Sequence, residues 1–211
     1  MLHDSHMNRV LAALGRDAEA PPPSVDTGIA CAAIVGIAAS LAIAPDLRGV
    51  LGALLAVVAV AIAAIDGRRF IIPNELNAAA FCLALVAAAA KDFDAAFPAM
   101  ADAVVRGAVL ALLFFGLSVG YRRIRGHDGL GLGDVKLAGA AGAWLDWQTV
   151  AVAVEIAAFA AIAVYLARRY VLGQSMSLTS RLPYGLFFAP AIWLGWLMET
   201  AGLLPLGMMP S

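Results

Sequence analysis

The chain has 211 residues, of which 63% are hydrophobic and 14% are charged, and its mean hydropathy is +0.87. This apolar share exceeds the roughly 45–50% of an ordinary globular domain, and long stretches lack the periodic polar positions of a soluble core. The net charge of −1 provides no clustered basic face for nucleic acid. These values indicate an integral membrane protein and exclude a disordered chain, collagen and a coiled coil.

The chain has two cysteines, Cys31 and Cys82, which lie in apolar stretches and have no C-x-x-C partner. This pattern predicts neither a disulfide framework nor a zinc site. We expect both cysteines to be small buried hydrophobic residues. No cluster of histidines or cysteines accompanies the acidic residues, so we expect no metal site and no cofactor.

Uncharged stretches predict an all-α, polytopic fold of about seven transmembrane helices with a cytoplasmic N-terminus. Because a span needs about 20 mainly apolar residues, with roughly 17 as the lower limit, the third and fourth stretches must extend into flanking residues. Glu155 interrupts the sixth stretch. The stretches cover residues 27–45, 49–65, 76–90, 107–121, 137–145, 147–167 and 182–198.

The fifth stretch is too short to cross a membrane alone. Extended to residues 135–147 it would measure about 20 Å at 1.5 Å per residue, against a hydrocarbon core of about 30 Å. Either this helix continues past Asp146, or the glycine-rich loop before it dips into the membrane under a cover of protein or water. We favour the second interpretation.

The distribution of basic residues predicts the orientation. Eleven of the fourteen lysines and arginines fall on the side of the N-terminus, which the positive-inside rule places in the cytoplasm. We expect a polar cytoplasmic tail at residues 1–26, without the pattern of a cleaved signal peptide. The transmembrane domain would follow at residues 27–202 and a short C-terminal tail at residues 203–211. Only Arg48, Lys91 and Arg106 fall on the opposite side.

Two aspartates are predicted at the same cytoplasmic boundary. Asp66 closes the second stretch, and Asp134 opens the fifth within Gly131-Leu132-Gly133-Asp134. Either could be an interfacial cap, since helix ends at this level commonly carry charge. However, ionisable groups at membrane depth are functional candidates by default. Glycines allow the backbone before Asp134 to bend sharply, and Pro73 stops the helix that contains Asp66.

These residues resemble the type IV prepilin peptidases, the GxGD-type intramembrane aspartic proteases. Three motifs carry the resemblance: an aspartate followed by Ile-Pro-Asn at residues 66–74, Gly-x-Gly-Asp-x-Lys-Leu at residues 131–137, and Pro-Tyr-Gly at residues 183–185. The resemblance implies that Asp66 and Asp134 are catalytic. It implies substrate-binding or supporting roles for Pro73, Asn74, Gly131, Gly133, Lys136, Pro183, Tyr184 and Gly185.

The resemblance also implies a substrate and a location. The partner would be a pilin-like precursor, cut after a glycine at the end of a short basic leader, at the cytoplasmic face of the bacterial inner membrane. Longer members have an N-terminal domain with paired C-x-x-C motifs associated with N-methylation. Because this chain has none, it is most similar to the short forms of Flp or Tad pili, and we expect cleavage without methylation. No nucleic-acid partner is expected.

Two neighbouring carboxyls suit acid–base hydrolysis because they share one proton and titrate as a unit. Helix dipoles favour a carboxylate at a helix N-terminus and disfavour it at a C-terminus. Considering the helix of each residue, we therefore assign Asp134 as the base and Asp66 as the acid.

Three further charged positions have alternative interpretations. Lys136 either extends to the headgroups or contacts the substrate or the turn around the aspartates. Glu155 is either a packing residue, protonated or hydrogen-bonded, or part of a proton relay. Asp102 and Arg106, four residues apart on one helix, are expected to pair.

Two other functions compete with the peptidase. A small transporter or proton channel could use Asp66, Asp134 and Glu155 as relay carboxylates, although the sequence has no inverted repeat of the transporter type. A noncatalytic subunit of a pilus machine could also keep the same fold. Cleavage of a precursor by purified protein distinguishes the three.

Overall fold

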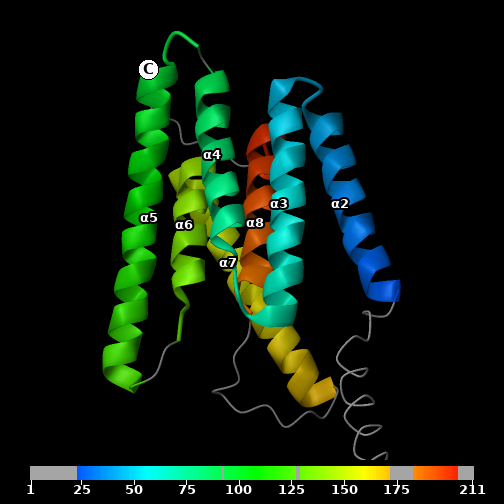
Figure 1. Cartoon of the computed structure of the whole chain (residues 1–211), viewed down its shortest axis with the longest axis vertical. Coiled ribbons are helices and arrows are strands. Elements are labelled where there is room, and N and C mark those ends of the chain that lie inside the picture. Colours follow the sequence, from blue (N-terminus) through cyan, green and yellow to red (C-terminus); the bar gives the residue numbers. More distant parts are fainter. Residues whose placement is uncertain (1–22, 92, 127–128, 172–182, 204–211) are drawn as a thin grey trace, which may run out of the picture. The chain divides into compact units, whose positions relative to one another are not determined.

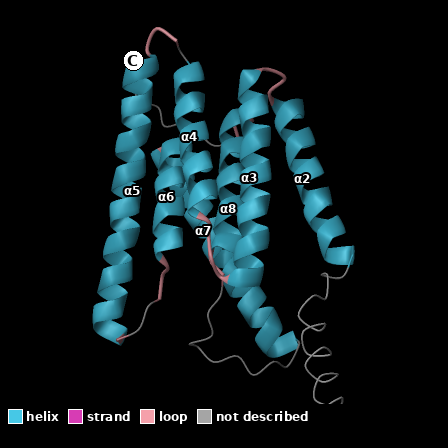
Figure 2. Cartoon of the chain, viewed as in Figure 1, coloured by secondary structure: helices cyan, strands magenta, loops and turns pink. Residues whose placement is uncertain are grey.

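The structure is a computed structural model, and it describes residues 23–91, 93–126, 129–171 and 183–203. Within these residues it is all-helical and has no strand, as Figure 2 shows. A π-helical turn, η1 (Ala167–Val171), extends α7. The α-helices are α2 (Pro23–Ile43), α3 (Leu47–Arg69), α4 (Asn74–Lys91), α5 (Ala96–Arg125), α6 (Leu132–Trp144), α7 (Trp147–Leu166) and α8 (Gly185–Thr200).

The chain divides into two compact units, Met1–Ala32 and Ala33–Ser211. Of the first unit the structure describes only residues 23–32, which are the first part of α2. The second unit contains the rest of α2 and all of α3 to α8, and it contains every residue of the candidate site described below. Of the expected tails at residues 1–26 and 203–211, residues 1–22 and 204–211 lie outside the described residues, and residues 23–26 already belong to α2.

The seven uncharged stretches each correspond to one of these helices. The third and fourth stretches both extend into their flanking residues, since α4 has 18 residues and α5 has 30. Four helical segments are long and apolar enough to cross a membrane, which agrees with a multi-pass membrane protein. They are Asp26–Ile43, Leu47–Arg69, Ala96–Arg125 and Trp147–Val171.

The short helix α6 has 13 residues, the expected length, but it begins and ends earlier than predicted. It begins at Leu132 because the Asp134 side chain accepts a hydrogen bond from the backbone nitrogen of Gly131, at 3.2 Å, and so caps the first turn. It ends at Trp144, and Asp146 is already the N-cap of α7. The alternative in which this helix continues past Asp146 is therefore wrong.

Helix α6 packs against α4, α5 and α8, and every residue from Leu137 to Trp144 is buried. Small residues allow its close contact with α5. A Cβ added to Gly142 would lie 2.7 Å from the carbonyl oxygen of Arg106, and one added to Gly107 would lie 2.6 Å from that of Gly139. Small residues at helix contacts are typical of membrane bundles, where backbone proximity maximises van der Waals packing.

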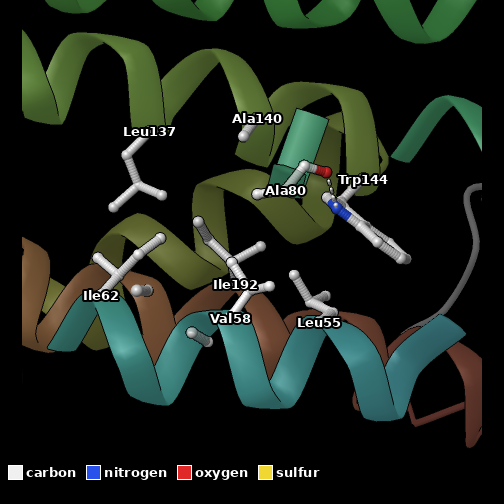
Figure 3. Close-up of a pocket in the computed structure, with 10 residues that line it drawn as sticks. Leu55, Val58, Ile62, Ala80, Leu137, Ala140, Trp144 and Ile192 are labelled. Atoms are coloured by element: carbon white, nitrogen blue, oxygen red, sulfur yellow. Dashed lines mark hydrogen bonds between the residues drawn. The ribbon is translucent and has the colours of Figure 1, made fainter. Parts of the chain in front are cut away.

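A small cavity of about 10 Å³ lies between α3, α4, α6 and α8, and Figure 3 shows its lining. Ile62, Leu137, Trp144 and Ile192 are among the residues around it, and all of the lining surface is apolar. Apolar cavities of this kind stay dry. Ile62 precedes Asp66 by one helical turn, and Leu137 follows Asp134 by almost one turn. The bundle interior next to the two aspartates is therefore made of apolar side chains.

Two predictions about side-chain environment were wrong, and one about side-chain pairing is confirmed. Cys31 and Cys82 are free and exposed, not buried. Glu155 is also exposed, so it is not a packing residue of the bundle interior. Asp102 and Arg106 do pair, but Arg106 is buried and also donates a 3.2 Å hydrogen bond from Nε to the carbonyl of Gly142.

Candidate functional site: two aspartates at one end of the bundle

The helices alternate in direction, which brings the three sequence motifs to one end of the second unit. Helices α3, α5 and α7 end there, and α4, α6 and α8 begin there, at the lower end of Figure 1. The first motif is the α3–α4 connection, the second is the start of α6, and the third leads into α8. Residues far apart in the sequence therefore lie close together.

Asp66 lies in the last turn of α3 and is only 5% exposed. Its Oδ2 accepts a hydrogen bond of 3.0 Å from the backbone nitrogen of Leu186, in the first turn of α8. Gly185 makes this approach possible, because a Cβ there would lie 2.9 Å from the same oxygen. The N-terminus of α8 thus holds a carboxylate that belongs to α3, as helix N-termini commonly hold anions.

The turn between α3 and α4 positions a buried isoleucine beside the starts of α6 and α8. Phe70 adopts a left-handed conformation, with φ of 54°, and ends α3. Ile72 follows and is 7% exposed. A Cβ added to Gly133 would lie 3.1 Å from the Cβ of Ile72, and one added to Gly185 would lie 2.6 Å from its Cδ1. Ile72 therefore packs against the starts of both α6 and α8.

Asp134 is half-buried in the first turn of α6, and its charge interacts with that of Asp66. The structure thus brings together the two residues that the sequence singled out. It also changes the argument about their proton. Asp66 lies at the C-terminal end of its own helix but accepts a hydrogen bond from the N-terminus of α8, so both carboxyls lie at helix N-termini. The dipole argument therefore no longer distinguishes an acid from a base.

Tyr184 lies immediately before α8, on the side of Asp134. Burial and, to a lesser extent, the negative charge of Asp134 together raise the pKa of Tyr184 to about 12. Its ring packs on Phe188 at a centroid distance of 5.2 Å, and Phe188 stacks on Phe114 at 5.8 Å. Tyr184 is therefore held in place by aromatic contacts and keeps its hydroxyl proton at any physiological pH.

Lys136 makes one of the two contacts considered for it. Its Nζ donates a 2.7 Å hydrogen bond to Oδ1 of Asn74, the first residue of α4. This is a contact with the turn around the aspartates, one of the alternatives left open for Lys136, and it joins the first motif to the second. Among the described residues Lys136 makes no ion pair with Asp134, because side chains two residues apart on a helix point in different directions.

The sequence did not single out three residues that shape the site: Ile72, Asn77 and Leu186. Leu186 contributes a backbone nitrogen, which has no sequence signature. Asn77 could have been noticed as a polar residue at the start of an otherwise apolar helix. The remaining expected site residues, Gly131, Pro73 and Pro183, lie beside these contacts in the chain.

Comparison with known proteins identifies the family. The model of the type IV leader peptidase family matches residues 53–166, which is more than half of the chain and includes both aspartates. The chain belongs to the type IV leader peptidase family. Among its relatives is a prepilin leader peptidase/N-methyltransferase from Aeromonas hydrophila, 25% identical over 162 residues, covering 77% of this chain and 54% of that protein.

Two further relatives show different extents of similarity. A prepilin leader peptidase/N-methyltransferase of Burkholderia pseudomallei is 39% identical over 88 residues, or 41% of this chain and 28% of that protein. The leader peptidase HopD of Escherichia coli is 29% identical over 138 residues, or 65% of this chain and 86% of HopD. The chain thus spans about half or less of the first two relatives. No solved structure matches it.

Proposed function

We propose that this member of the type IV leader peptidase family is a membrane-embedded aspartic endopeptidase that removes the short basic leader from pilin-like precursors. Asp66 and Asp134 are its catalytic residues. The observation that carries the proposal is that these two carboxyls, 68 residues apart in the sequence, lie at the same end of the bundle, near enough for their charges to interact. The names of the relatives supply the substrate class.

The reaction needs one carboxylate and one carboxylic acid. The carboxylate takes a proton from water, the resulting hydroxide attacks the carbonyl carbon of the scissile peptide, and the acid gives its proton to the carbonyl oxygen. The attack produces a tetrahedral intermediate. Its collapse breaks the C–N bond as a proton passes to the leaving nitrogen. The products are a leader with a new carboxyl group and a pilin with a new amino group, and the pair again shares one proton.

The distribution of arginines supports a cytoplasmic location for this end of the bundle. Arg68, Arg69 and the three arginines that end α5 lie at the same end of the bundle as the two aspartates, and the positive-inside rule places such residues in the cytoplasm. The enzyme would span the bacterial inner membrane with its N-terminus in the cytoplasm and with α2 to α8 as about seven membrane helices. Because α6 covers only about 20 Å, the glycine-rich segment before it would enter the membrane with Asp134.

The substrate helix can stay in the bilayer while its end is cut. The leader of a pilin precursor ends at the cytoplasmic end of a hydrophobic helix, which is the level proposed for the two aspartates. Only the short junction then has to unwind and reach water. The leader is basic, so the arginines around the site would not attract it.

The test is cleavage of a pilin precursor by the purified full chain in detergent, followed by mass spectrometry. The proposal predicts one cut after a glycine. Intact precursor after prolonged incubation would instead favour a noncatalytic assembly subunit. A transporter or channel is the weaker alternative, because Glu155, one of its three relay carboxylates, is exposed.

A further inference from the structure

Asn77 lies directly between the two aspartate motifs. It is in the first turn of α4, it is 5% exposed, and its backbone nitrogen donates a 3.2 Å hydrogen bond to the carbonyl of Pro73. This hydrogen bond joins the α3–α4 connection, which follows Asp66, to the first turn of α4, which contains Asn77.

The side chain of Asn77 reaches from α4 to the segment that holds Asp134. Its Nδ2 donates a 3.4 Å hydrogen bond to the carbonyl oxygen of Gly133, the residue before Asp134. Its Oδ1 is buried and has no hydrogen-bond partner among the described residues. The reverse orientation of the amide would place two acceptors against each other, so the Gly133 carbonyl fixes which atom is the donor.

This arrangement does not favour stability. A buried acceptor without a partner loses its hydration and gains nothing in return. The carbonyl of Gly133 lies within α6 and is already an acceptor position of that helix. A leucine at position 77 would fill a similar volume and avoid the unpaired oxygen. The role of the asparagine is therefore the hydrogen bond that its amide donates to the carbonyl of Gly133.

We infer that Asn77 is a positioning residue that fixes the first turn of α6, and with it the Asp134 carboxyl, relative to the turn after Asp66. The inference rests on the proposed function, since it assigns Asn77 to the alignment of the same two carboxyls. Asn77 acts through Gly133 and does not itself touch the substrate. Its loss should therefore lower kcat and leave KM unchanged.

The test compares two variants that each remove one hydrogen bond between α4 and α6. Asn77→Leu removes the bond beside Asp134. Trp144→Phe removes the 2.8 Å bond from the indole nitrogen to the carbonyl of Ala80, visible in Figure 3, ten residues along α6 from Asp134. Precursor cleavage gives kcat and KM for each full-length variant, and thermal unfolding in detergent gives its stability.

Asn77→Leu is expected to keep or raise the unfolding midpoint while kcat falls about 10- to 100-fold, the size of effect that a small misplacement of a catalytic group produces. Trp144→Phe is expected to lower the midpoint and keep kcat within about twofold, because it leaves the first turn of α6 intact. Wild-type kcat in Asn77→Leu overturns the inference. So does a loss of kcat that follows the loss of stability equally in both variants.

A second measurement does not require cleavage, and so separates this inference from the proposed function. In a Cys31→Ala, Cys82→Ala background, the pair Asp66→Cys and Asp134→Cys is oxidised and the rate of disulfide formation is followed. Adding Asn77→Leu should slow this rate about tenfold, in line with the expected misplacement, whereas adding Trp144→Phe should leave it unchanged. An unchanged rate with Asn77→Leu overturns the inference even if the wild-type chain cleaves no precursor.

Discussion

The Oδ2 atom of Asp66 accepts a hydrogen bond of 3.0 Å from the backbone nitrogen of Leu186, 120 residues further along the chain. Leu186 is the second residue of α8, where a backbone N–H has no acceptor within its own helix. The bond therefore satisfies the helix N-terminus and orients a carboxyl of the candidate pair at the same time. It makes the third motif a part of the site.

Leu186→Pro should remove this donor with little change to the fold, because proline is tolerated in the first turn of a helix and Gly185 before it is conformationally permissive. A hydrogen bond to a charged group contributes about 1.5–3 kcal/mol, so we expect kcat/KM to fall roughly 10- to 100-fold. The measurement is precursor cleavage, with circular dichroism as the check of folding. Leu186→Ala is the control, since it keeps the N–H, and equal losses in both variants would contradict this role for the backbone.

Gly185→Ala should displace Asp66. The added Cβ would lie 2.9 Å from Oδ2 of Asp66 and 2.6 Å from Cδ1 of Ile72, so one of these side chains must move. We expect kcat to fall by at least about tenfold, because small displacements of catalytic groups are costly. Gly67→Ala is the matched control, since its Cβ would make an ordinary 3.4 Å contact with Leu186. It should keep activity, and a loss as large as that of Gly185→Ala would indicate a general packing effect.

Lys136 and Asn74 should show energetic coupling. The hydrogen bond between them is 2.7 Å long but exposed, so we expect a coupling energy of about 0.5–1 kcal/mol, in the range of other solvent-exposed charged contacts. The double-mutant cycle Lys136→Met, Asn74→Ala and the double variant measures it through kcat/KM. Strictly additive effects would show that the contact contributes nothing to the reaction.

Tyr184→Phe should keep the pH profile of cleavage. Because burial raises the pKa of Tyr184 to about 12, its hydroxyl is protonated throughout the range in which activity is measured, and the charge of Tyr184 would appear only above that range. The alkaline limb of the kcat profile should therefore be the same in wild type and Tyr184→Phe. A limb near pH 9–10 that vanishes in the variant would show that Tyr184 titrates there.

Glu155→Gln should leave cleavage within about twofold of the wild-type rate, as for most surface substitutions away from a site. The side chain is exposed on α7 and far along the sequence from the three motifs. The same precursor assay measures it. A loss of activity similar to that of an aspartate variant would restore the relay interpretation of this residue.

The sequence predicted which segments are helices because that information is local: charges interrupt apolar stretches, and each stretch became a helix. It did not predict which face of a helix is buried. Helix α2 with Cys31, α4 with Cys82 and α7 with Glu155 are apolar nearly all round, so hydrophobic periodicity does not reveal their inward side. This is why the predicted environments of these three residues were wrong.

The site, like the fold, was predictable from the sequence only in part. Asp66 and Asp134 were identifiable because charge at membrane depth is costly and therefore conspicuous. The hydrogen bond of Asp66 was not, because its donor is the backbone of Leu186 and any residue except proline could provide it. The dipole argument for the proton assignment lost its basis for the same reason, since it considered only the helix in which each aspartate lies. Ile72 looked like one more hydrophobic residue until the approach of Gly133 and Gly185 was visible.

The most direct test of the account compares cleavage of a pilin precursor by Asp66→Asn, Asp134→Asn and the double variant of the purified full chain. Groups that act as one catalytic unit are strongly non-additive, because removal of either already abolishes the shared chemistry. We therefore predict that each single variant loses at least about a thousandfold in kcat/KM and that the double variant is no worse than the singles. Substantial turnover by either single variant, or a double variant whose loss equals the product of two moderate losses, would contradict the central claim that these two carboxyls form one active site.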